Sequence, residues 1–193
     1  MKKILISIFF LLGAIQANSA DWKSFGLGEE RKYLGNHFLI EYPPDFTFSP
    51  ESRIFPVGYK GERRKAKIDI GGDFLMLESR QRKFSIIVFN FVPDLGNSDG
   101  SPMDVDETIA FQKSRLNFPK VEHRKSCTVV HGITRDGLHY IAYFIPNRES
   151  AGGAVFSQKL VFTSPTPMKQ VDPVIIEVIS RFKSSYDIYG PPQ

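Results

Sequence analysis

The chain has 193 residues, and its 25 lysine and arginine residues exceed its 21 aspartate and glutamate residues, which gives a formal net charge of +4 at pH 7. Nucleic-acid binding usually requires a concentrated basic surface, so this small excess predicts no nucleic-acid partner. The only cysteine is Cys127, which excludes an intramolecular disulfide and leaves stability to the hydrophobic core.

The first 20 residues have the three parts of a secretory signal peptide. Lys2 and Lys3 form a positive start, 4–15 are a predominantly apolar run of 12 residues, and 16–20 are small or polar. This run is too short for a transmembrane anchor, because a membrane-spanning helix needs about 20 apolar residues. We therefore expect cleavage within a residue of Ala20 and a soluble periplasmic or secreted protein.

Removal of 1–20 leaves 173 residues, in which 23 basic residues face 21 acidic ones, so the net charge falls to +2. No linker rich in glycine, serine or proline divides this length, which suits one domain. We expect an irregular lead-in over 21–36, a single globular domain over 37–184 and a flexible tail over 185–193.

The first strand is expected over 37–42, where Pro43 and Pro44 end it because proline lacks a backbone donor. A short second strand is expected over 46–48. The segment 53–67 is charged and contains glycine, which predicts a solvated surface loop. This loop carries a basic run that could contact an acidic protein partner or anionic lipid headgroups. The basic residues of the run are Lys60, Arg63, Arg64, Lys65 and Lys67.

Two further strands are expected over 74–78 and 84–92, because both runs are rich in β-branched and aromatic residues. The polar turn 79–83 between them predicts a hairpin. The segment 93–102 contains several glycine and proline residues and predicts a long loop. Long loops on rigid scaffolds often carry function, so 93–102 is a second candidate recognition surface.

A helix is expected to begin at Asp104, which can cap it, with Glu107 in the reciprocal capping position. Its apolar positions extend to Leu116, and Pro119 prevents continuation. Two strands are then expected over 123–133 and 138–145. The intervening 134–137 contains an Asp-Gly pair, which is typical of a tight hairpin turn.

The last strand is expected over 155–163, and the last helix begins after Asp172. Pro173 suits the first helical position, and Ile175, Val178, Ile179 and Phe182 repeat at helical spacing, which predicts a helix that packs on a sheet. The complete order of elements predicts an α+β fold, with a mostly antiparallel β-sheet packed against helices.

The segment 38–46, an apolar strand followed by Tyr-Pro-Pro-Asp-Phe, resembles the opening of the PsbP-like superfamily. The capped helix at Asp104, the 123–145 hairpin, the strand end at 162–165 and the helix end at 179–182 agree in order. The resemblance spans 33–184 and implies an α/β/α sandwich used mainly for binding. Members include photosynthetic accessory subunits, a nuclear import factor and bacterial envelope proteins similar to DcrB. It carries over no catalytic residue, and this chain lacks the cysteine that lipidates many DcrB-like proteins.

Two residue sets suggest metal sites. The first is three histidines of one expected hairpin, a possible zinc set, although no Cys/His or Glu-x-x-His cluster accompanies them. The second is an acidic set with oxygen ligands suited to calcium, but its spacing does not fit an EF-hand, so capping and solvation are the preferred interpretation. We expect no bound metal and no other cofactor. The sets are His123, His131 and His139, and Asp94, Asp99, Asp104 and Asp106.

Cys127 lies in a β-prone run and is interpreted as a small buried apolar residue. As an alternative, it could be a thiol nucleophile if His123 or His131, each four residues away, lay on the same strand face. No Gly-x-Ser-x-Gly elbow, phosphate-binding loop or dinucleotide fingerprint occurs, so we expect no enzyme activity.

Three functional hypotheses follow. The first is a non-enzymatic binding or accessory protein of the cell envelope, with a protein partner. The second is a neutralising, immunity-type or chaperone partner of a secreted effector. The third is a hydrolase with an unrecognised site, which would require a pocket with convergent polar groups. The first hypothesis is favoured.

Overall fold

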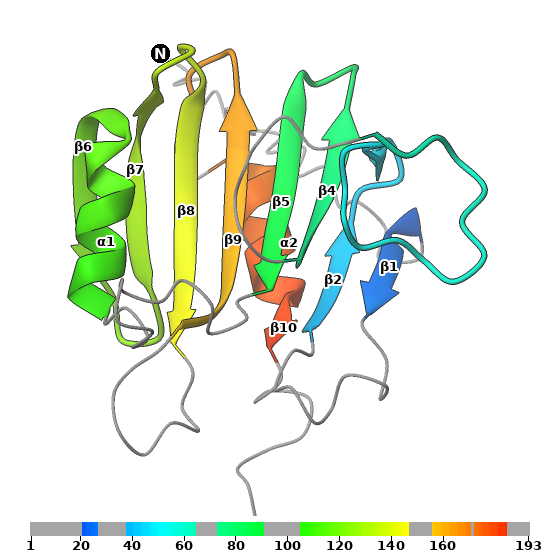
Figure 1. The fold of residues 1–193 in the computed structure, drawn as a ribbon, viewed down its shortest axis with the longest axis horizontal. Helices are drawn as coiled ribbons and strands as arrows, with labels where there is room; N and C mark the ends of the chain where they lie inside the picture. The colour runs from blue at the N-terminus through cyan, green and yellow to red at the C-terminus, as the bar shows by residue number, and fades with distance from the viewer. Residues whose placement is uncertain are drawn as a thin grey trace, which may run out of the picture.

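The computed structural model describes residues 21–26, 38–64, 73–90, 105–146, 156–170 and 172–184. In these residues two helices accompany strands that form two antiparallel sheets (Figure 1). The seven-stranded sheet has the order β3-β4-β5-β9-β8-β7-β6, and the three-stranded sheet has the order β1-β2-β10. The elements are β1 (Lys23–Gly26), β2 (Phe38–Tyr42), β3 (Thr47–Phe48), β4 (Asp73–Ser79), β5 (Phe84–Asn90), α1 (Val105–Ser114), β6 (Leu116–His123), β7 (Thr128–Thr134), β8 (His139–Pro146), β9 (Phe156–Ser164), α2 (Pro173–Arg181) and β10 (Lys183–Ser184).

Both faces of the seven-stranded sheet carry apolar side chains, because successive residues of a strand point to opposite faces. On one face, Leu160 and Phe162 of β9 join a core that includes Ile175 and Val178 of α2 and residues of the three-stranded sheet. On the other face, Val161 belongs to a second cluster that includes Ile109 of α1. Figure 1 shows α1 in front of β6 and β7 and α2 behind the sheet. The predicted α+β class, with a mainly antiparallel sheet, is confirmed.

The hairpin β7–β8 and helix α2 match their sequence patterns closely. In the hairpin, the Thr134 N–H donates to the Leu138 carbonyl at 2.8 Å, and Gly137 adopts φ 83°, which favours glycine. In α2, the Asp172 carboxylate accepts a hydrogen bond from the Val174 N–H at 2.9 Å, and Pro173 is the first helical residue. The β4–β5 hairpin is also present.

The strand expected over 123–133 was wrong in its extent. Residues 124–127 are a turn that separates β6 from β7, and the Arg124 N–H donates to the Cys127 carbonyl at 2.9 Å. The preceding helix ends at Ser114, and Leu116, expected on its apolar face, begins β6. Pro119 is tolerated in β6 because this strand is the edge of the sheet and has a register shift between Asn117 and Lys120.

The lead-in over 21–36 was expected to be irregular, but its described part contains β1. Lys23–Gly26 pairs antiparallel with β2, and Phe25 is buried in the core beside Phe38. The pattern was missed because β1 is short and only one of its four side chains is buried. β10 was likewise not expected.

Several predicted features lie outside the described residues. They are the signal peptide 1–20, most of the lead-in, the loop 93–102, the tail 185–193, and the residues Lys65, Lys67, Asp94, Asp99 and Asp104. Within the part of the chain that the structure describes, neither helix has the length and apolar character that crossing a bilayer requires.

Candidate functional site

Residues 49–64, which we call the aromatic–basic loop, project from the β3–β4 edge of the large sheet (Figure 1). The loop is fixed to β4 by backbone hydrogen bonds. The Ser49 N–H donates to the Met76 carbonyl at 2.8 Å, and the N–H groups of Arg53 and Ile54 donate to the Phe74 carbonyl at 2.9 and 3.0 Å. The C-terminal end of the loop is held to its beginning, because the Arg64 N–H donates to the Pro50 carbonyl at 2.6 Å. The loop is therefore an ordered extension of the sheet edge.

Residues 56–59 form a tight turn at the tip of this loop. The Tyr59 N–H donates to the Pro56 carbonyl at 3.1 Å, and Gly58, the third residue of the turn, has φ 78°. A type II turn requires a positive φ at its third residue, which glycine adopts without strain. Val57 is consequently held at the tip with a relative exposure of 102%.

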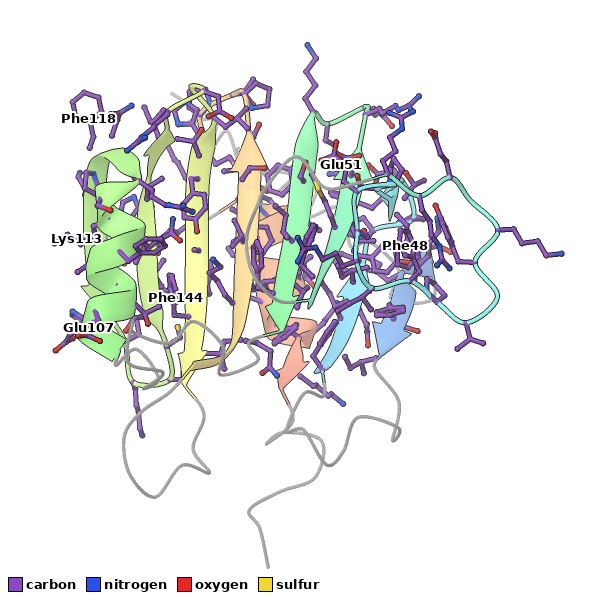
Figure 2. The ribbon with its side chains drawn as sticks, in the orientation of Figure 1. Phe48, Glu51, Glu107, Lys113, Phe118 and Phe144 are labelled. Atoms are coloured by element: carbon purple, nitrogen blue, oxygen red, sulfur yellow. The ribbon has the colours of Figure 1, made fainter. Side chains whose placement is uncertain are left out.

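Aromatic rings support the turn from below. Phe55 and Tyr59 stack with their ring centroids 4.5 Å apart and their planes 24° apart. Tyr59 contacts Phe48 edge-on at 6.0 Å, and Phe48 in turn contacts Phe25 of β1 at 5.6 Å. Phe48 lies beside the loop in Figure 2. A continuous series of aromatic contacts therefore connects the loop to the small sheet and holds its tip in one arrangement.

The predicted basic run has different environments at its described positions. The Arg63 guanidinium lies over the Phe55 ring at 4.9 Å from the centroid. Arg64 forms a two-pronged ion pair with Glu62, with distances of 2.8 and 2.9 Å, and these hydrogen bonds lower the pKa of Glu62. Lys60 is exposed. Among the described basic residues of the run, Arg64 is therefore paired with an acid, whereas Arg63 lies against an aromatic ring and Lys60 extends into solvent.

The three histidines do not form a metal centre. His123 Nδ1 lies 3.4 Å from the Thr128 hydroxyl, and His131 Nε2 lies 3.4 Å from Glu122 Oε1. His131 and His139 line one cavity together with Met168, but His123 is not part of it. In the described ranges no three His, Cys, Asp or Glu side chains are grouped to hold a metal ion. Asp106 of the acidic set is exposed in the first turn of α1.

Cys127 is not placed for nucleophilic chemistry. It lies in the 124–127 turn, so the expected strand face shared with His123 and His131 does not exist. The side chain is half-buried against the main core, and burial raises the pKa of its thiol. A raised pKa reduces the thiolate fraction, which is the reactive form. The structural interpretation of Cys127 agrees with this environment.

Sequence reasoning missed the buried Lys159 at the centre of the sheet. Its Nζ lies 4.1 Å from the centroid of Phe89 on β5 and 5.7 Å from that of Phe144 on β8, which are its cross-strand neighbours. Burial lowers the pKa of Lys159 to about 7. The sequence shows a lysine within the apolar strand 155–163. Its pattern does not show that both faces of that strand are covered, and therefore that the lysine is buried.

Comparisons with protein-family models, curated proteins and solved structures found no match for this chain. The site is therefore characterised by its own geometry. Within the described residues, that geometry offers a rigid, exposed surface of aromatic and cationic groups on the aromatic–basic loop.

Proposed function

We propose that this protein is an exported, non-enzymatic binding or accessory protein of the cell envelope, and that its aromatic–basic loop recognises an acidic surface of a protein partner. The predicted signal peptide supports periplasmic or secreted localisation. The α+β class is compatible with the finer proposal of a PsbP-like α/β/α sandwich, a fold used mainly for binding. Fold alone does not determine function, so the loop carries the proposal.

The observation that carries it is the fixed exposure of the loop tip. Val57 is fully exposed, although the turn beneath it is closed by a hydrogen bond and supported by the stacked rings of Phe55 and Tyr59. A rigid exposed loop loses little conformational entropy when it binds, and that loss is a major cost of association. An apolar side chain held in water by such a structure is suited to a contact site.

The charge of the loop indicates the chemistry of the partner. Arg63 and Lys60 are exposed beside the aromatic pair, whereas Glu62 is already engaged by Arg64. Arginine and tyrosine are enriched at the energetic centres of protein interfaces, because they combine apolar area with directional polar groups. Carboxylates of the partner would pair with Arg63 and Lys60 around an apolar contact at Val57.

The test is a double charge reversal, Lys60→Glu with Arg63→Glu, in the mature protein. We expect capture of the native partner from envelope extracts to fall about tenfold at low salt, because attraction becomes repulsion across the interface. The difference should shrink as salt rises, since screening acts over about 8 Å at physiological ionic strength.

The matched control reverses Lys125 and Arg135, which are exposed in turns next to β7, at the opposite edge of the sheet. This control should leave capture unchanged. An equal loss of capture in both double variants would show that binding depends only on net charge. Unchanged capture in the loop variant would show that the loop is not part of the interface.

A further inference from the structure

A cavity of about 170 Å³ lies at the β6 edge of the large sheet, across the molecule from the aromatic–basic loop. Its floor is formed by two adjacent strands. In their register His131 pairs with Ile141, and Ile133 pairs with His139. Residues two apart on a strand share a face, so these four side chains form a square with the histidines at opposite corners. Phe118 of β6 and Met168 complete the lining.

Phe118 is held at this cavity in a strained backbone conformation. Its φ is 53°, in the left-handed region that bulky residues avoid, and its side chain is 82% exposed. Such a conformation is energetically unfavourable for a residue that has a Cβ. Because most of the Phe118 ring is exposed, hydrophobic burial of the ring does not offset the backbone strain. Figure 2 shows Phe118 at the corner of the sheet, beyond the end of α1.

The strain is built into the pairing of β6 with β7. The register shift between Asn117 and Lys120 brings Phe118 out of the regular ladder. Opposite it, Gly132 allows the bulged backbone to come close, because a Cβ at this position would lie 2.9 Å from the Asn117 carbonyl oxygen. Bulges with a matching glycine often direct a side chain toward a site.

A polar network fixes the remaining wall, which comes from the segment 165–170. Gln170 Nε2 donates to Glu122 Oε1 at 2.9 Å, while Arg124 donates to Glu122 Oε2 at 3.2 Å and also to Gln170 Oε1. The hydrogen bonds from Arg124 and Gln170 lower the pKa of Glu122. This segment is therefore tied to β6.

We propose that this cavity binds a small, neutral, single-ring aromatic molecule of the phenol class. An engineered cavity of about 150 Å³ in another protein holds benzene, so one ring fits the volume. The Phe118 ring can stack on a planar ligand, and the ring nitrogens of His131 and His139 can hydrogen-bond to a hydroxyl. The Glu122 carboxylate, 3.4 Å from His131 Nε2, is already paired with Arg124, which suits a neutral ligand.

The test is a titration of the mature protein with phenol, followed by amide NMR shifts. We expect saturable shifts at His131, Ile133 and His139 with a dissociation constant of about 1 mM, the range that seven non-hydrogen atoms can support. Cyclohexanol, of equal size but not planar, should bind several-fold more weakly. Equal binding of the two ligands, or no saturable shifts with phenol up to about ten times that constant, overturns the proposal.

Two variants locate the ligand. Phe118→Ser should weaken phenol binding about 3- to 10-fold, the value of one aromatic contact, and His139→Phe should abolish it by filling the cavity. Phe111→Ser removes the exposed aromatic ring of α1 and should leave binding unchanged. The amide spectrum of each variant reports whether it is folded, and Phe118→Ser alters an exposed side chain. Unchanged affinity in folded Phe118→Ser overturns the proposal, independently of the outcome for the aromatic–basic loop.

Discussion

The substitution Lys159→Met tests whether burial in the sheet lowers the pKa of the Lys159 amine. Burial lowers the pKa of Lys159 to about 7 from its ordinary value of 10.5. Attraction between an ammonium group and aromatic rings contributes about 0.5–2 kcal/mol and offsets only part of the desolvation. Methionine has a similar length and no charge, so it should be accommodated between Phe89 and Phe144.

The sign of the pH dependence follows from proton binding. Between pH 7 and 10 the unfolded state binds more protons at this lysine than the folded state does, so the wild-type protein becomes more stable as the pH rises. With pKa values of about 7 and 10.5, the change from pH 7 to pH 9 is about 2 kcal/mol. The methionine variant lacks this dependence, and it should be the more stable protein at pH 7.

The assay is urea denaturation of both proteins at pH 7, 8 and 9. The stability difference between variant and wild type should shrink by about 2 kcal/mol across this range. All other titrating groups are present in both proteins and cancel in the difference. Lys113→Met on α1, where the lysine is exposed, should show no such trend. A difference between Lys159→Met and wild type that stays constant with pH would show that Lys159 is charged in the folded protein.

Two further predictions concern the core and the thiol. Ile175 is fully buried and Ile176 is 49% exposed, so Ile175→Ala should cost about 2–5 kcal/mol in denaturant melts while Ile176→Ala costs under about 1 kcal/mol; similar losses would place α2 wrongly on the sheet. Cys127, half-buried with a raised pKa, should react with a disulfide reagent at pH 8 more slowly than an unfolded control, and an equal rate would refute its burial.

Local sequence signals predicted an element correctly where residues at its ends mark its boundaries. Asp172 and Pro173 mark the start of α2, and Asp136-Gly137 marks the β7–β8 turn. β6 had no such signal, because buried and exposed residues do not alternate along it and it contains Pro119. Its place in the sheet depends on pairing with β7 across a register shift, a property of two strands together that neither pattern displays alone.

Of the candidate site, the sequence predicted only the basic residues. The run of basic residues over 60–67 indicated that the loop could bind an acidic partner. The contacts of Phe55 with Tyr59 and Arg63 join residues four and eight apart in an irregular segment, where no helical or strand periodicity indicates which side chains meet. The pairing of Arg64 with Glu62, which reduces the effective charge of the loop, is hidden for the same reason.

Photo-crosslinking from the loop tip tests the central claim, that this loop is the recognition surface. A photoreactive phenylalanine derivative would replace Val57 in protein exported in its native cells, with Asp136 in the β7–β8 turn as the matched control position. We predict a discrete adduct from position 57 that is absent from position 136 and is lost when Lys60→Glu and Arg63→Glu are added. No adduct at position 57, or one that is indifferent to the charge reversals, would contradict the account.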